Sequence, residues 1–195
     1  MLRRDQRVEK EACDGTACAG AVSEHGPETM NAAQRKALRD TMKLLIDNEP
    51  LVNYPLHDVR GKADAATWAL TGEQMRSRLK QGRHLMMDCS QGIACVYKWS
   101  GLGNPSGNIS GPGFTGSMLD HLGHHSDPAR ARVGAIVVYG PSTGEHASLV
   151  YQAGADPLLW SHGFDGGPQL IRLSKQRTVH RGPVTFLDVS GIGPA

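Results

Sequence analysis

Hydrophobic residues in the first half of the chain recur at three- and four-residue intervals, the spacing typical of amphipathic helices. From residue 31 to residue 48, Leu38, Met42 and Leu45 follow this spacing, and Asn31 is a suitable N-cap. We expect further helices at residues 72–81, 89–100 and 115–122. A Gly/Pro/Ser/Asn-rich loop separates the last two.

After Asp127 and Pro128 the pattern changes to short runs in which apolar and polar residues alternate, which predicts β-strands separated by turns. These runs cover residues 135–139, 146–152, 158–161, 169–174 and 184–189. Helices followed by a meander of strands indicate an α+β fold. We therefore expect N-terminal helices packed on an antiparallel sheet of about five strands.

The first 29 residues lack hydrophobic periodicity and are rich in Gly, Ala and charged side chains. They predict a flexible leader, with residues 30–195 as one domain. The leader carries Cys13 and Cys18, for which two free thiols are a better interpretation than a zinc site, because only His25 is a nearby additional ligand.

The 195-residue chain has a net charge of only +2, which gives no support to a general nucleic-acid-binding role. It contains no apolar run long enough to span a membrane and no apolar core of a secretory signal near its start. We therefore expect a protein made in the cytoplasm, without membrane insertion and without structural disulfides.

The strongest candidate for chemistry is Cys89, which follows Asp88 at the predicted start of a helix. Asp88 suits the N-cap, and Gln91 lies three residues further on, where it could complete a capping box. This places the thiol at the positive end of the helix dipole, where an anion is favoured and where N–H groups such as that of Ser90 can hold an oxyanion. Taken alone, Cys89 would also suit a buried structural position.

Two histidines on neighbouring predicted strands could activate this thiol. If the hairpin turns about Gly154, His146 lies opposite His162 and both rings share one face of the sheet. His146 could then take the proton of Cys89 while His162 orients His146, as in a cysteine-peptidase triad. A register slip of one residue would put the two rings on opposite faces.

Several segments together resemble the NlpC-type cell-wall cysteine peptidases, in the version found in endolysins of phages that infect actinobacteria. The resemblance rests on Met87-Asp88-Cys89-Ser90-Gln91, on Tyr97-Lys98-Trp99-Ser100-Gly101, on Gly113-Phe114-Thr115-Gly116 and on Asp156-Pro157-Leu158-Leu159-Trp160-Ser161-His162-Gly163. It covers about residues 31–189. The cysteine motif alone is moderately specific, and the ordered set is more so.

The resemblance implies a papain-like fold and a peptidoglycan hydrolase without a cofactor. By position, Cys89 corresponds to the nucleophile, His146 to the base and His162 to the third polar residue. Tyr54 corresponds to a tyrosine that lines the site, although a loop anchor is an equal alternative, and Trp160 is a candidate wall of the substrate groove or of the core.

The implied reaction is hydrolysis of a stem-peptide amide bond, for example between D-glutamate and diaminopimelate, during host lysis. Such an enzyme is held in the cytoplasm of the infected cell until it is released to the wall. Gln91 replaces a common Gly and Ala135 replaces a common Asp, which removes a possible supporting carboxylate. No separate wall-binding module is evident.

Four alternatives remain open from the sequence. The chain could be a virion tail-tip or wall-contact protein, or an amidase that cuts between muramic acid and alanine. A zinc amidase could use His121, His124 and His125, although a solvated loop is favoured there. Gly111-Pro112-Gly113-Phe114-Thr115-Gly116 matches a dinucleotide-binding spacing, but without a preceding strand it fits a loop at the rim of a groove better.

Overall fold

The computed structural model describes residues 30–55, 65–163 and 166–195. The predicted leader, with Cys13 and Cys18, lies outside the described residues. The elements follow in chain order: α1 (Ala32–Asp47), η1 (Glu49–Leu51), β1 (Val52–Asn53), α3 (Gly72–Lys80), β2 (Leu85–Met86), α4 (Cys89–Trp99), α5 (Thr115–His121), β3 (Gly123–His125), η2 (Pro128–Arg130), β4 (Ile136–Tyr139), β5 (His146–Gln152), β6 (Leu158–Gly163), β7 (Gly166–Arg172), α6 (Leu173–Val179) and β8 (Val184–Asp188).

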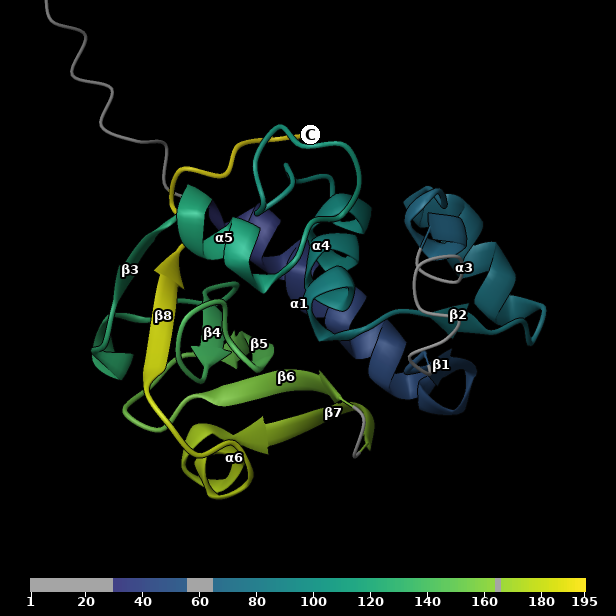
Figure 1. The fold of residues 1–195 in the computed structure, drawn as a ribbon. Helices are drawn as coiled ribbons and strands as arrows, with labels where there is room; N and C mark the ends of the chain where they lie inside the picture. Colours follow the sequence, from purple (N-terminus) through teal and green to yellow (C-terminus); the bar gives the residue numbers. More distant parts are fainter. Residues whose placement is uncertain (1–29, 56–64, 164–165) are drawn as a thin grey trace, which may run out of the picture.

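A six-stranded sheet in the order β3-β8-β4-β5-β6-β7 forms one side of the molecule (Figure 1). Every neighbouring pair in this sheet is antiparallel. β1 and β2 form a separate parallel pair beside α3, and β1 contacts β7 of the large sheet. The predicted α+β class is thus confirmed. The antiparallel sheet has six strands, whereas about five were expected.

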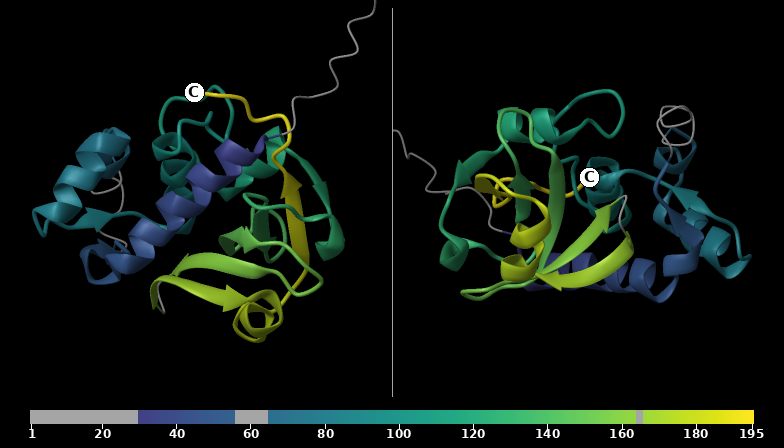
Figure 2. Two further views of the ribbon diagram at one scale, coloured as in Figure 1. Left: turned by 180° about the vertical axis from the view of Figure 1, so that it is seen from behind. Right: turned by 60° about the horizontal axis from the view of Figure 1, so that its bottom comes forward.

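The large sheet has two buried faces, because both positions of the strand alternation carry apolar side chains. On one face, Ala147, Leu149 and Trp160 belong to the main core with α1, α4 and α5. On the other face, Val150 and Leu159 belong to a smaller cluster that α6 helps to cover. The left view of Figure 2, seen from behind, shows the long helix α1 in front of α4. Among the described helices, none is long and apolar enough to cross a membrane.

Capping residues set the starts of the helices that were predicted from the hydrophobic pattern. The Asn31 side chain accepts a hydrogen bond from the N–H of Gln34 at 2.9 Å, and the Gln34 side chain accepts one from Asn31, so α1 begins with a capping box. Thr71 and Gln74 do the same for α3. These helices confirm the prediction to within about a residue at each end.

The short strands β1 and β2 were not predicted from the sequence, and two further elements differ from the prediction. Residues 123–125, expected in a loop, pair with β8 as the edge strand β3. The strand expected to run to residue 174 ends at Arg172, and α6 follows. Asp156 accepts hydrogen bonds from the N–H and the hydroxyl of Ser174, at 2.8 and 2.7 Å, and this tertiary contact supports the start of α6.

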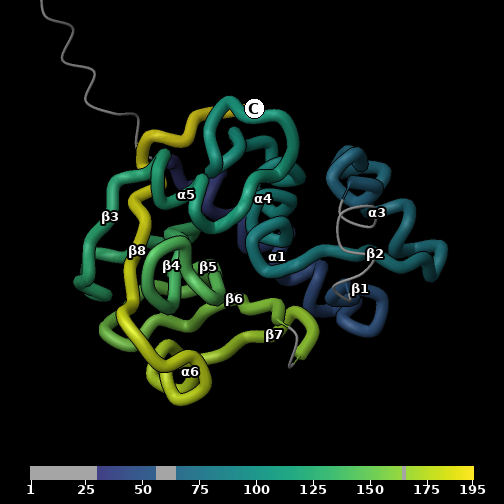
Figure 3. The backbone as a smooth tube through the Cα atoms, viewed as in Figure 1, coloured from purple at the N-terminus to yellow at the C-terminus, as the bar shows by residue number. Residues whose placement is uncertain are grey.

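The loop after α4 is held by the C-terminal segment. The backbone trace shows the two running together over the top of α4 (Figure 3). The N–H of Gly103 donates to Gly193 at 2.9 Å, and the N–H of Ala195 donates to Gly101 at 3.1 Å. The Gly-rich loop is thereby tied down before it reaches Phe114, at the start of α5.

Candidate active site

Cys89 is the first residue of α4, and Asp88 is its N-cap. One oxygen of the Asp88 carboxylate accepts hydrogen bonds from the N–H of Gln91 and from the Ser90 hydroxyl, each at 2.8 Å. This is the cap that the sequence predicts, although only the Asp88 half of the expected capping box is formed. The cap fixes the Cys89 thiol at the N-terminal turn of the helix.

Three hydrogen-bond donors surround the Cys89 sulfur: the Tyr54 hydroxyl and the backbone N–H groups of Ala147 and Ser90. Each favours the thiolate and lowers the pKa of the thiol. Burial of the side chain and the nearby Asp88 carboxylate act in the opposite direction and prevail, so the pKa of Cys89 is raised. The resting thiol is therefore protonated at neutral pH, and its reaction needs a base.

The thiol borders a groove of about 180 Å³ at the start of β5. Tyr54, Ser90 and Asp88 line the groove on one side, and Phe114 and Glu145 contribute from the segments that precede α5 and β5. Phe114 is 56% exposed at its rim. The Gly-rich loop therefore borders the groove, as predicted. Glu145 was not identified from the sequence, because nothing in its local pattern distinguishes it from a solvated turn residue.

The two predicted histidines lie on opposite faces of the sheet, so the expected register is wrong. Ser148 pairs with Ser161, and Leu149 pairs with Trp160. The prediction had paired residue 148 with residue 160. A register irregularity between Val150 and Gln152 offsets the two strands by one residue, as a β-bulge does. Since side chains alternate, this offset separates His146 from His162.

His162 lies on the sheet face that α4 covers, near the residues that lead into Cys89. Its Nε2 donates to the backbone oxygen of Met87 at 2.9 Å, and its ring centre lies 5.6 Å from that of Tyr54. The ring is fully buried. Burial lowers the pKa of His162, against the opposing effects of the Met87 and Asn53 carbonyls and of Asp88. His162 is therefore a neutral imidazole at neutral pH, and Tyr54 contacts both it and the Cys89 sulfur.

His146 lies on the other face, within a buried polar network. Its Nε2 is 2.9 Å from the Ser161 hydroxyl, and its ring stacks on His180 with centres 4.2 Å apart. Gln176 donates to the same Ser161 hydroxyl at 2.6 Å and accepts from Ser148 at 3.1 Å. The part that Gln176 and His180 play in this network was not predicted, because α6, which carries Gln176 and precedes His180, was not predicted from the sequence.

The remaining predicted site residues divide between the groove and the core. Tyr54 and Ser90 line the groove. Trp160 does not: it is completely buried and packs on Gly92 of α4, so its prediction as a substrate-binding residue is wrong. Its large apolar ring instead fixes the distance between α4 and β6.

Of the predicted histidine cluster, His121 ends α5 and His125 belongs to β3. The described residues contain no group of three or more His, Cys, Asp or Glu side chains that could hold a metal ion.

Comparison of this chain with protein-family models, with curated proteins and with solved structures finds no match.

The effect of Asp88 on the thiol can be measured with Asp88→Asn. Asparagine keeps the oxygen that caps α4 but removes the charge that raises the pKa of Cys89. We expect the thiol pKa to fall, so that more thiolate is present at pH 7 and alkylation by iodoacetamide is several-fold faster there. The rates of the two proteins should converge at a pH above both thiol pKa values. A slower reaction of the variant at pH 7, with the fold intact by circular dichroism, would contradict this electrostatic assignment.

Proposed function

We propose that this protein is a cysteine hydrolase that cleaves an amide bond in the stem peptide of bacterial peptidoglycan. The observation that carries the proposal is the position of Cys89: its thiol lies at a capped helix N-terminus, borders a groove and accepts hydrogen bonds from three donors. A helix-borne cysteine packed against an antiparallel sheet is compatible with a papain-like, NlpC-type fold, which is part of the proposal. The choice of peptidoglycan rests on the motifs around Cys89 and His162.

In this mechanism His162 is the base, because its ring lies on the side of the sheet that carries Cys89. Because Nε2 donates to Met87, the Nδ1 atom of the neutral ring takes the proton of the thiol as substrate enters the groove, and the Tyr54 hydroxyl donates a hydrogen bond to the resulting thiolate. The thiolate attacks the scissile carbonyl carbon, and the resulting oxyanion accepts hydrogen bonds from backbone N–H groups near Ser90. The imidazolium then protonates the leaving amine, and water hydrolyses the thioester.

The assignment of His162 as base changes the roles expected from the family resemblance, in which His146 is the base. The His146 ring is engaged with Ser161 and His180 on the far face of the sheet. For His146 to reach the sulfur, its ring would have to leave that network. His146 acts in this proposal as a structural residue that holds β5, β6 and α6 together.

The test is digestion of purified actinobacterial peptidoglycan, followed by mass spectrometry of the soluble fragments. We expect a new amine on diaminopimelate and a new carboxyl on D-glutamate. The activity should be lost after treatment with iodoacetamide and retained in the presence of EDTA. A new amine on L-alanine would identify the muramoyl-alanine amidase instead. Inhibition by EDTA but not by iodoacetamide would reject the thiol mechanism, and intact peptidoglycan would favour a structural role in a virion.

A further inference from the structure

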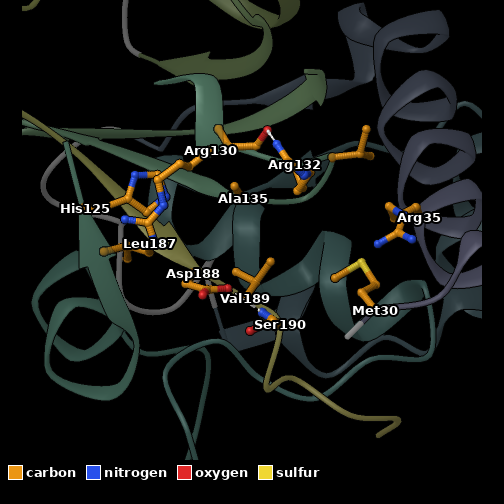
Figure 4. Close-up of a pocket in the computed structure, with 12 residues that line it drawn as sticks. Met30, Arg35, His125, Arg130, Arg132, Ala135, Leu187, Asp188, Val189 and Ser190 are labelled. Carbon is orange, nitrogen blue, oxygen red and sulfur yellow. Dashed lines mark hydrogen bonds between the residues drawn. The ribbon is translucent and has the colours of Figure 1, made fainter. Parts of the chain in front are cut away.

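A second cavity of about 100 Å³ lies where the start of α1 approaches β8 and the segment before β4 (Figure 4). It shares no lining residue with the groove beside Cys89. Its apolar lining includes Met30, Ala135, Leu187 and Val189. These four side chains are buried, with exposed fractions of 5% or less. The cavity is thus separate from the groove beside Cys89. We call the surface formed by these four buried side chains its apolar floor.

Three arginines surround this floor: Arg35 from α1, Arg130 from η2 and Arg132 from the following loop. Arg35 and Arg130 lie at opposite ends of the cavity (Figure 4). Among the residues that the structure describes, neither forms a salt bridge. Arg132 donates to the backbone oxygens of Ala129 and Ala131, at 3.0 and 3.2 Å, which holds its guanidinium in place.

Asp188 is the acidic side chain in the lining, so the cavity carries an excess of positive charge. One Asp188 oxygen accepts a hydrogen bond from the N–H of Ser190 at 2.9 Å. That bond lowers the pKa of Asp188, as do His125 and Arg130 to a smaller extent. Asp188 is therefore ionised at neutral pH and offsets one of the three arginines, which leaves two positive charges in excess.

His125 adds a polar atom that is without a partner in the described part of the chain. Its ring stacks on Phe186 with centres 5.6 Å apart and planes inclined by 8°. The Nδ1 atom is buried and has no hydrogen-bond partner among the described residues. A buried polar atom of this kind calls for a polar group that the protein itself does not supply.

We propose that this cavity binds the carboxylate of a small aliphatic acid. Arg130 and His125, which lie at one end of the cavity (Figure 4), would hold the carboxylate, because guanidinium groups form paired, charge-assisted hydrogen bonds with it. Arg35, at the other end, adds to the positive charge that attracts the anion. The aliphatic part would cover the apolar floor formed by Leu187 and Val189. The volume of about 100 Å³ is smaller than the ~300 Å³ of typical drug-sized sites, so an acid with a short aliphatic chain fits best. This inference does not depend on the proposed hydrolase activity.

The test is isothermal titration of the full chain with hexanoate, with hexanol as a neutral molecule of similar length and with inorganic phosphate. We expect saturable binding of hexanoate, and at least about ten-fold weaker binding of the other two. The double variant Arg35→Gln/Arg130→Gln should bind hexanoate at least about ten-fold more weakly than the wild type. Arg83→Gln, which alters an arginine in a different surface hollow beside α3, should bind as the wild type does.

Each other outcome overturns the proposal in a different way. Equal binding of hexanol would show an apolar hollow without anion recognition. Equal binding of phosphate would show an inorganic-anion site to which the apolar floor contributes nothing. Failure of hexanoate to bind, or its unchanged binding to the double variant, would show that the arginines do not form a carboxylate site.

Discussion

Cys89→Ala is expected to lower the rate of peptidoglycan hydrolysis by at least about a thousand-fold, because it removes the nucleophile of the proposed reaction. The thiol makes a small contribution to the core, since it borders the groove and lies at the edge of α4. The melting temperature of the variant should therefore remain close to that of the wild type. The measurement is the release of amines from purified peptidoglycan at a fixed protein concentration.

Cys95→Ala is the matched control, because it changes the other cysteine of α4. Cys95 is completely buried in the main core and does not line the groove. We expect this variant to keep its activity per folded molecule. If Cys89→Ala kept a tenth or more of the wild-type rate, Cys89 would not be the nucleophile, and the proposed mechanism would be wrong.

His162→Gln is expected to reduce kcat by a factor of about 10² to 10⁴, the usual contribution of a general base. The structure predicts a different result for His146→Gln. Since His146 belongs to the buried network with Ser161 and His180, its replacement should lower the free energy of unfolding by about 1–3 kcal/mol and leave kcat within a few-fold. Urea denaturation and initial rates, measured on both variants, separate these effects.

The pH profile gives a second measure of the same assignment. The base must be neutral to accept the thiol proton, and burial lowers the pKa of His162 from its ordinary value of 6.5. The acid limb of kcat/KM should therefore rise through a value below 6.5 and should disappear in His162→Gln. The reverse pattern, with an inactive His146→Gln and an active His162→Gln, would restore His146 as the base and would require a different packing of its ring.

The elements that were predicted well are those whose signals are local. Asn31 and Asp88 are caps that act within three residues of their own position, and the apolar spacing that follows Asn31 needs no other part of the chain. The alternation in residues 146–152 likewise marks a strand by itself. Both kinds of signal therefore appear in the sequence before any tertiary contact is known.

The features that were missed depend on contacts between distant segments. The start of α6 depends on Asp156, which binds Ser174 from 18 positions away. The register of β5 and β6 depends on an irregularity near Tyr151. Because apolar residues lie on both faces of the sheet, the predicted register and the observed one would both bury apolar side chains. The sequence therefore predicted that Cys89 and Tyr54 lie in the same site, as they do. It placed both histidines on one face of the sheet, whereas they lie on opposite faces.

The Asp88 cap has a consequence for the chemical durability of the protein. Peroxides and disulfides react with thiolates far faster than with thiols. Because Asp88 and burial keep Cys89 protonated, and only 8% of the residue is exposed, the side chain is a poor target for oxidation while the groove is empty. We therefore expect the Cys89 sulfur to be oxidised slowly in the resting protein. In the proposed reaction, the same protonation means that the thiol must lose its proton again for each substrate.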